Sequence, residues 1–571
     1  MGSEASDALF QAALAQHRAG QLNEAAAGYR QVVALAPEHY AAHLNLGVVL
    51  RALRRLDEAL ASYDRALAIR PRSVDAHHNR GAVLFDLRRA GDALASYDRA
   101  IALGSDNPDT HHRRGLALRE LGRLDEALAS LDHAIGLKPD EASLHRDRGG
   151  VLLTLKRWDD ALASYERALA LGPESAGAHN GRGTALVGLG RLEAALASYG
   201  AAIARAPDFA LAHRNRGVTL RKLGRPAEAV QSYDAAIALN PDVAEAYWYR
   251  SLCHLATGRF AEGWRDYERR WDTQEFVAEA YGNVTPQILA RLDRAVERAD
   301  LAGRDVLLVG EQGVGDVLMF ASLIPDVVAA GARVSVLCDR RLRGLFAQSF
   351  PGVALLDPPT AARDLDRFDR VLAIGSLGRL FRNRLEDFPG APYLAPRPEV
   401  RARWAERLGP AAGRKRVGLS WRGGLARTGR SDRSLDLEAL RPVLDLPDCE
   451  FVSLQYGAPE AEVAAINAGL ARPIRLFPAD EIDDFEDLAG LVQNLDLVIS
   501  VQTALVHLCG ALGAPALVMV PATAEWRYMS AGPSMPWYDS ITLFRQGADK
   551  DWGPVVRRVT AAAETALQTA G

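Results

Sequence analysis

The chain has 571 residues, which is too many for a single hydrophobic core and indicates several domains. Its net charge of -4 gives no electrostatic reason to expect nucleic acid or an anionic membrane as a partner. No apolar run is long enough to span a membrane, residues 1–30 lack a signal-peptide pattern, and the four scattered cysteines include no CxxC pair. These features predict a cytoplasmic protein whose cysteines are reduced and buried.

The first half of the sequence repeats itself at a constant interval. One column of the repeat holds Gly47, Gly81, Gly115, Gly149, Gly183 and Gly217, which are equally spaced. A second column holds alanine and a third holds tyrosine, with Leu131 in one place. Glycine and alanine let two helices cross closely, tyrosine fills the remaining space, and a proline ends most units. The interval and the columns resemble the tetratricopeptide repeat, which implies an α-helical solenoid of about eight units over residues 1–277.

The last unit, residues 244–277, departs from this pattern. Ser251 stands in the glycine column and Gly263 stands in the alanine column. The end of the unit, from Trp264 to Trp271, is rich in aromatic and charged residues. We therefore expect this unit to cap the solenoid and to dock on the C-terminal half of the chain.

A column of histidines has the same spacing and consists of His43, His77, His111, His145, His179 and His213. Successive repeats stack about 10 Å apart, so neighbouring imidazoles do not readily share one metal ion. The tetratricopeptide pattern implies a packing residue in this column, and histidine is often partly buried. We predict packing rather than metal binding.

A mixed polar column stands two positions later and consists of Asn45, Asn79, Arg113, Asp147, Gly181 and Asn215. The column resembles that of the O-linked N-acetylglucosamine transferases, whose matching asparagines hold the backbone of a protein substrate. The resemblance implies that Asn45, Asn79 and Asn215 bind a protein acceptor, since an amide both donates and accepts hydrogen bonds. Only three of the six positions are asparagine, so a solvated groove face is the open alternative.

Strands and helices alternate in the second half. The apolar runs predict strands at Asp305–Val309, Arg333–Leu337, Val353–Leu356, Arg370–Ile374, Arg416–Trp421, Phe451–Gln455, Ile474–Phe477, Leu497–Val501 and Ala516–Val520. Alternation of this kind predicts parallel sheets, and a proline-rich segment at 389–398 divides the strands into two α/β halves. Ligands of such sheets bind beyond the carboxyl ends of the strands, so two facing sheets predict one cleft.

A glycine-rich turn comes after the first of these strands. Gly310, Gly313 and Gly315 interrupt the apolar run, and a helical stretch begins near Asp316. A strand, a turn and a helix start together present backbone N–H groups that attract an anion. The turn does not match the dinucleotide fingerprint, because Leu318 replaces the third glycine, and it has no P-loop lysine. It presents the carboxylate of Asp316 instead.

Two more segments fall at predicted strand ends. The first runs from Ser420 to Gly424 and is followed by Arg427, Arg430 and Arg433. The second is 500–504, directly before a helix that contains His507. Cationic side chains and a helix N-terminus suit a phosphate group. For the arginines, a solvated charged loop is the open alternative.

These segments together resemble a known enzyme family. The sequence Gly315-Asp-Val-Leu318 with Pro325, the later Ser-Val-x-Thr-Ala-x-x-His-Leu at 500–508, and Glu-Trp-Arg-Tyr at 525–528 resemble the heptosyltransferase-like GT-B glycosyltransferases. The resemblance implies a multidomain chain in which the solenoid and a linker at 278–302 precede two Rossmann-like halves at 303–395 and 396–571. Tetratricopeptide repeats joined to such a domain resemble bacterial protein glycosyltransferases, including those that modify flagellin.

The resemblance also implies roles for residues. Asp316 corresponds to the proposed catalytic base, and Arg433 to a basic residue that contacts the donor phosphate. Gln502 stands where the family has aspartate. The expected contacts to the donor or its phosphate come from Gly313, Gly315, Arg422, Arg433, Gln502, Thr503, Ala504 and His507. Further candidates are Gln312, Gln455 and Arg527.

Sugar transfer needs a base for the acceptor hydroxyl and stabilisation of the departing phosphate, and a single carboxylate is enough for one-step inversion. We therefore predict an inverting glycosyltransferase that needs no metal and no cofactor besides its nucleotide-sugar donor. Its predicted acceptors are Ser or Thr hydroxyls of a protein held by the repeats, with flagellin as one candidate. The alternative is a tetratricopeptide scaffold whose GT-B domain binds a nucleotide without turnover, and Gln502 is its best argument.

Overall fold

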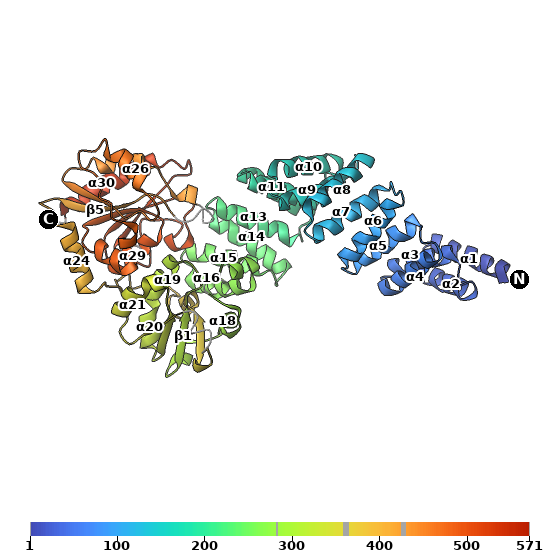
Figure 1. Cartoon of the computed structure of the whole chain (residues 1–571), viewed down its shortest axis with the longest axis horizontal. Coiled ribbons are helices and arrows are strands. Elements are labelled where there is room, and N and C mark those ends of the chain that lie inside the picture. Colours follow the sequence, from blue (N-terminus) through green and yellow to red (C-terminus); the bar gives the residue numbers. More distant parts are fainter. Residues whose placement is uncertain (1, 281–283, 358–364, 424–429, 483, 570–571) are drawn as a thin grey trace. The chain divides into compact units, whose positions relative to one another are not determined.

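The computed structural model describes residues 2–280, 284–357, 365–423, 430–482 and 484–569 (Figure 1). The chain divides into two compact units, Met1–Thr219 and Leu220–Gly571. The division falls inside the repeats, so the predicted solenoid at 1–277 spans it and the last repeat helices belong to the second unit. Gly424, Arg427 and the side chain of Arg430 lie outside the described residues.

The first unit consists of antiparallel helix pairs that stack in chain order (Figure 1). Its helices are α1 (Gly2–Arg18), α2 (Leu22–Leu35), α3 (Tyr40–Ala52), α4 (Leu56–Ile69), α5 (Val74–Asp86), α6 (Ala90–Ala102), α7 (Pro108–Glu120), α8 (Leu124–Leu137), α9 (Ala142–Thr154), α10 (Trp158–Leu171), α11 (Ala176–Gly188), α12 (Leu192–Arg205) and most of α13 (Ala210–Lys222). The expected small and aromatic columns meet where two helices cross. A Cβ atom added at Gly81 would lie 2.7 Å from the ring of Tyr97, and one added at Gly183 would lie 2.6 Å from the ring of Tyr199. The repeat interval therefore encodes the crossing of each helix pair.

Each histidine of the column is tied to its own repeat. The ring Nε2 atom of His43 lies 2.9 Å from the carbonyl oxygen of Pro37, and that of His145 lies 2.8 Å from the carbonyl oxygen of Pro139. The same contact recurs at His77, His111, His179 and His213. A neutral ring with its proton on Nε2 donates to that carbonyl and holds the turn against the helix. The column therefore has a structural role, as predicted, and it acts through a hydrogen bond as well as through packing.

The second unit contains the last repeat helices and two parallel sheets. Its helices are α14 (Pro226–Leu239), α15 (Ala244–Ala256), α16 (Phe260–Tyr267), α17 (Gln274–Ala280), α18 (Pro286–Arg291), α19 (Val314–Phe320), α20 (Ile324–Ala329), α21 (Arg343–Ser349), α23 (Gly378–Phe381), α24 (Pro398–Leu408), α25 (Arg441–Leu444), α26 (Glu460–Asn467), α27 (Ala479–Ile482), α28 (Phe485–Val492), α29 (Ala504–Leu512) and α30 (Gly553–Thr569). The first sheet has the order β3 (Ala354–Leu356), β2 (Arg333–Leu337), β1 (Asp305–Val309), β4 (Arg370–Ala373). The second has the order β6 (Cys449–Ser453), β5 (Lys415–Ser420), β7 (Leu497–Val501), β8 (Ala516–Val520), β9 (Ile541–Arg545).

All strand pairs in both sheets are parallel, which confirms the prediction of parallel sheets in this region. One predicted strand was wrong: residues 474–477 form only an isolated bridge, between Arg475 and Val452. Pro473 and Pro478 flank this run, and proline cannot donate to a sheet ladder. The edge strand β9 was not predicted, because its side chains alternate between buried and exposed and form no continuous apolar run.

Each sheet reverses its strand order at one place. In the first sheet the chain moves outward from β1 to β3 and then returns to β4 on the other side of β1. In the second sheet the same reversal occurs between β5 and β7. Such switch points open a crevice at the carboxyl ends of the two adjacent strands. The glycine-rich turn begins where β1 ends, and the 500–504 segment ends β7, so both predicted segments lie at switch points.

One continuous hydrophobic core joins the last repeat helices, the first sheet and α29, and a second core lies beneath α30. All four cysteines are buried and free, in agreement with the prediction of reduced thiols.

Candidate functional site

The glycine-rich turn brings the two α/β halves into close contact. Gly313 is the N-cap of α19, and a Cβ atom added at Gly315 would lie 3.3 Å from the Cα atom of Ala504 and from Cδ2 of His507. A larger residue at 315 would therefore press on the first turn of α29. Figure 1 shows α19 and α29 side by side. Two of the predicted motifs thus meet in space although they are far apart in sequence.

Asp316 lies in the first turn of α19 and forms an ion pair with Arg527. Arg527 comes from the segment after β8, and its other terminal nitrogen pairs with Glu525. Glu525 in turn accepts a hydrogen bond of 2.7 Å from Arg433. The four side chains form a row of alternating charge in which Asp316, Arg527 and Arg433 were predicted and Glu525 was missed.

The two arginines of this row are largely withdrawn from water. Their side chains are each 12% exposed. Burial lowers the pKa of Arg527, but Asp316 and the neighbouring tyrosines together raise it by more, so the net shift is upward. Burial also lowers the pKa of Arg433, without reversing its charge near neutral pH. Two concentrated positive charges beside a helix N-terminus are suited to binding a phosphate or diphosphate.

Thr503 and His507 belong to the start of α29. Thr503 is the N-cap, and its hydroxyl lies 3.4 Å from that of Ser500. His507 is buried, and its Nδ1 atom lies 3.3 Å from the hydroxyl oxygen of Tyr538. Burial, with a smaller contribution from Arg527, holds the pKa of His507 well below its usual range. The imidazole is therefore neutral and adds no charge to the site.

Gln502 lies at the end of β7 and is 1% exposed. Among the described residues, no hydrogen-bond partner is present for either its amide oxygen or its amide nitrogen. Leaving such a group buried and unpaired costs about 1–3 kcal/mol, so an amide of this kind calls for a partner such as a bound water, ion or ligand. The backbone of Gly423 packs against this residue, since a Cβ atom added at 423 would lie 3.0 Å from the carbonyl oxygen of Gln502.

Gln455 and Arg422 have mainly structural partners here. The amide oxygen of Gln455 accepts from the backbone N–H groups of Trp421 and Arg422 at 2.9 and 2.8 Å, and its nitrogen donates to the carbonyl oxygen of Tyr456 at 3.0 Å. Arg422 forms an ion pair of 3.2 Å with Glu462. Gln455 therefore joins the loops after β5 and β6, and its amide is already engaged without a ligand.

Gln312 and its neighbour Glu311 face the end of the repeats. The amide nitrogen of Gln312 donates to the hydroxyl of Tyr267 at 3.2 Å. Glu311 is buried and pairs with Arg270 at 3.0 Å. A signal for this contact was present in the sequence, because the aromatic and charged segment 264–271 was expected to dock on the C-terminal half. That expectation is confirmed.

The mixed polar column of the first unit is half-buried at five of its six positions. Asn215 donates to the amide oxygen of Asn180 at 3.0 Å, and Asn45 is hydrogen-bonded to Tyr29. Arg113 pairs with Asp109 at 2.7 Å, and His112 with Asp147 at 2.7 Å. The three asparagines thus belong to a column in which several side chains bond to neighbouring repeats.

Two hollows of the structure lie away from these residues. One of about 410 Å³ is lined by residues 141–146 and 168–175, and one of about 490 Å³ by residues 290–295 and 369–371. Within the described ranges, no group of three or more His, Cys, Asp or Glu side chains is placed to hold a metal ion. The helices of the described part also include none that is long and apolar enough to cross a membrane.

Comparisons with known proteins identify a curated relative and several solved structures that are similar to parts of the chain. Protein FlbA of Caulobacter vibrioides is 33% identical to the chain over 285 residues, which cover 46% of the chain and 47% of FlbA. The chain therefore spans about half the length of this curated relative. A tetratricopeptide repeat protein from Parabacteroides merdae is 17% identical and covers 44% of the chain and 99% of its own length, with a TM-score of 0.37. YrrB, a tetratricopeptide protein with an unusual peptide-binding site, is 22% identical, covers 38% and 95%, and has a TM-score of 0.25.

Structural likenesses with TM-scores this low carry no argument about the chain. The family comparison is more specific, because residues 10–74, 62–108, 112–176, 180–241 and 219–275 each match the tetratricopeptide repeat. These segments agree with the spacing of the sequence columns and with the helix pairs of the structure. The N-terminal part of the chain, over about residues 10–275, therefore consists of tetratricopeptide repeats.

Proposed function

We propose that residues 303–571 form a GT-B glycosyltransferase that moves a sugar, with inversion, from a nucleotide-activated donor to a Ser or Thr hydroxyl of a protein. The observation that carries this proposal is the meeting of α19 and α29, which sets Asp316 beside two largely buried arginines and a helix N-terminus. A general base and an anion site must lie within one sugar of each other for this reaction, and the switch points of the two sheets supply them.

In the proposed reaction, Asp316 takes the proton of the acceptor hydroxyl as its oxygen bonds to the anomeric carbon. The bond from that carbon to the donor phosphate breaks in the same step, and the nucleotide leaves with the electron pair. Arg433, Arg527 and the first-turn amides of α29 stabilise the charge on the leaving phosphate. The buried amide of Gln502 is available to the donor, because it has no partner among the described residues.

The ion pair between Asp316 and Arg527 sets an order of binding within this proposal. A carboxylate whose oxygen is bonded to an arginine is not free to accept the proton of an acceptor hydroxyl. A donor phosphate competes for Arg527 and loosens its hold on Asp316. The donor therefore binds before the acceptor is deprotonated.

The repeats are proposed to supply the protein acceptor, with Asn45, Asn79 and Asn215 holding its backbone. Flagellin is one acceptor that the family resemblance offers. Capture by a surface separate from the reacting centre would let one enzyme modify several sites on a flexible segment.

A second candidate function is a tetratricopeptide scaffold whose GT-B domain binds a nucleotide without turnover. Two observations favour it: Asp316 is engaged by Arg527, and neutral Gln502 stands in place of the family's aspartate. Both functions share an anion site, so binding of a nucleotide does not separate them.

The test is a release assay on the full chain with UDP-, GDP-, ADP-, CDP- and CMP-linked sugars. Free nucleotide is measured with and without the proteins that co-purify with the chain. Enzymatic function predicts that at least one donor is consumed over many turnovers. Tight binding of a nucleotide with no release from any donor would support the scaffold. In the same assay, Asp316→Asn should lower turnover, because it removes the proposed base. Its matched control is Asp305→Asn, which alters an exposed carboxylate at the opposite end of β1 and leaves turnover unchanged.

A further inference from the structure

The final repeat unit contains a charged residue that is fully withdrawn from water. Arg270, in the 3₁₀ helix Glu268–Asp272, is 0% exposed and lies over the rings of Tyr267 and Trp271 at 4.2 and 5.0 Å. Burying a guanidinium is costly unless its charge and hydrogen bonds are matched. A repeat that only capped the solenoid would not need such a group.

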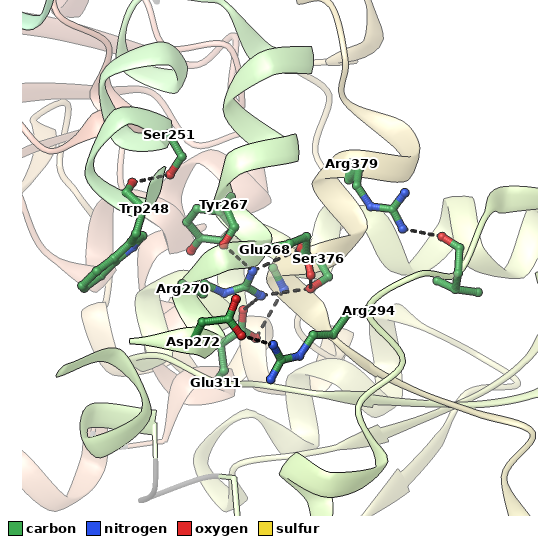
Figure 2. Close-up of polar contacts among 12 residues, drawn as sticks. Trp248, Ser251, Tyr267, Glu268, Arg270, Asp272, Arg294, Glu311, Ser376 and Arg379 are labelled. Atoms are coloured by element: carbon green, nitrogen blue, oxygen red, sulfur yellow. Dashed lines mark hydrogen bonds and ion pairs between the residues drawn. The ribbon is translucent and has the colours of Figure 1, made fainter. Parts of the chain in front are cut away.

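Arg270 is matched by three side chains, two of them from distant parts of the chain (Figure 2). It donates to Glu311 at 3.0 Å, to Ser376 at 2.9 Å and to Glu268 at 3.1 Å. Burial lowers the pKa of Arg270, but Glu268, Glu311 and their neighbours together raise it by more, so the group stays protonated.

Glu311 is the second residue of the glycine-rich turn and is buried with Arg270. Its other oxygen accepts from the backbone N–H of Gly375, at 3.3 Å, in the turn after β4. A Cβ atom at 375 would lie 2.3 Å from the Glu311 carboxylate, so only glycine fits there. Arg270 therefore fixes the turn after β1 against the turn after β4, which are the two sides of the switch point.

An independent set of contacts links the same repeat to the other side of the candidate site. The ring of Trp526 lies edge-on to that of Trp264, at 5.6 Å between centroids, and 6.3 Å from that of Tyr267. Trp526 immediately precedes Arg527, the partner of Asp316. Tyr267 also accepts from Gln312. One repeat-derived segment thus contacts both stretches of chain that carry the Asp316–Arg527 pair.

We infer that the final repeat, residues 244–277, is part of the candidate site and that Arg270 is a positioning residue for the turn that carries Asp316. Arg270 acts through Glu311 and touches no reacting group itself. The inference depends on the proposed function only when enzyme activity is measured. The conformational rigidity of the turn can be measured without any substrate.

The experiment compares two variants of the full chain, Arg270→Met and Arg270→Met/Glu311→Gln, by hydrogen–deuterium exchange and thermal unfolding. The single variant leaves a buried carboxylate unpaired, so its thermal midpoint falls and the amides of 311–316 exchange at least about tenfold faster. The double variant removes that charge and regains most of the midpoint, but the turn still exchanges fast because the hydrogen bond between Arg270 and Glu311 is absent. Segment 497–512 of β7 and α29 keeps its protection in the double variant.

Arg416→Met serves as the matched control, since Arg416 is 9% exposed and pairs with Glu450 away from the turn. It lowers the midpoint without changing exchange at 311–316. If Arg270→Met does not fold, Arg270→Lys keeps the charge with fewer donors and gives an intermediate exchange rate. The inference is overturned if the double variant restores wild-type protection of the turn, because the cluster would then serve folding alone. Fast exchange of the turn together with no release of nucleotide from any donor by the wild-type chain would refute the proposed function and leave this inference standing.

Discussion

The two compact units place their charges in different ways. In the first unit, Arg80, Arg114 and Arg148 pair with Asp64, Asp98 and Asp132, at one repeated short separation in sequence, and these pairs are partly exposed. In the second unit, Arg270, Arg433 and Arg527 each have a partner far along the chain, 41, 92 and 211 residues away, and the arginines are buried or nearly so. The repeats use one local arrangement many times, whereas the α/β unit gathers distant charges around two turns.

This difference indicates where chemistry is concentrated. Exposed pairs of the repeat kind contribute little to stability and do not perturb their members strongly. Buried charges are costly, and proteins tend to keep them where binding or catalysis needs them. The cluster at α19, α29 and the 525–528 segment is therefore the stronger candidate for chemistry, and the repeats are the stronger candidate for protein recognition.

The largest expected effect is on turnover at Asp316. Asp316→Asn removes the proposed base and keeps the size of the side chain, so transfer falls by about 10²–10⁴. The thermal midpoint falls only modestly, because Arg527 loses Asp316 as a charged partner but keeps its ion pair with Glu525. Rates are measured with the donor identified in the release assay. Near-normal turnover would exclude Asp316 as the base.

The next prediction compares the loss of a buried arginine with the loss of a partly exposed one. Arg270→Met leaves Glu311 buried and unpaired, and we expect it to lower the free energy of unfolding of the second unit by about 3–5 kcal/mol. Arg148→Met breaks a partly exposed pair of the repeats and costs about 0–1 kcal/mol in the first unit. Denaturant unfolding with probes in each unit measures both. Equal losses would contradict the contrast drawn between the units.

A smaller effect is expected on nucleotide binding. Arg433→Ala removes a charged hydrogen bond to the donor phosphate and weakens binding of the free nucleotide by about 1.5–3 kcal/mol. Calorimetry with the nucleotide that binds the wild type gives the difference. Arg441→Ala is the control, because this exposed arginine of the same half bonds to Asp445 and to the carbonyl oxygen of Gly469. Unchanged affinity in Arg433→Ala would remove this residue from the site.

The smallest effect concerns pH. The pKa of His507 is lower in the folded chain than its ordinary value near 6.5, so the unfolded chain binds more protons below that pH. The free energy of unfolding of the second unit therefore falls as pH drops from about 7 to about 5.5, by up to about 1.4 kcal/mol per pH unit from this residue. His507→Gln should remove that part of the slope. Parallel pH profiles for the two proteins would show that His507 is not the source.

The sequence predicted those parts of the fold that local pattern determines. The constant interval between the members of each column predicted the helix pairs and their glycine crossings. Continuous apolar runs predicted eight of the nine described strands, with both ends close to those in the structure. Strand β9 escaped because its alternating burial gives no such run. The run Ile474–Phe477 was wrongly predicted as a strand, because its apolar residues suggest one but the flanking prolines prevent a continuous sheet ladder.

The candidate site was predictable only in part. Asp316, Arg433 and His507 lie in motifs that can be read within a short stretch of sequence. Glu525 and Arg270 were not identified as site residues, because Arg433 lies 92 residues from Glu525 and Glu311 lies 41 residues from Arg270, and no local spacing encodes such pairs. Gln455 was predicted to reach a ligand, but its amide is already engaged by the backbone of a neighbouring loop, which sequence alone does not reveal.

In the proposed enzyme, turns from both halves form one anion site in which a donor phosphate replaces Asp316 as the partner of Arg527. A crystal structure of the full chain with its preferred nucleoside diphosphate tests this most directly. We predict phosphate oxygens within hydrogen-bond distance of Arg433, Arg527 and the first-turn amides of α29, with the carboxylate of Asp316 released towards the cleft. A nucleotide bound elsewhere, or bound there with the Asp316–Arg527 pair intact, would contradict the proposed site.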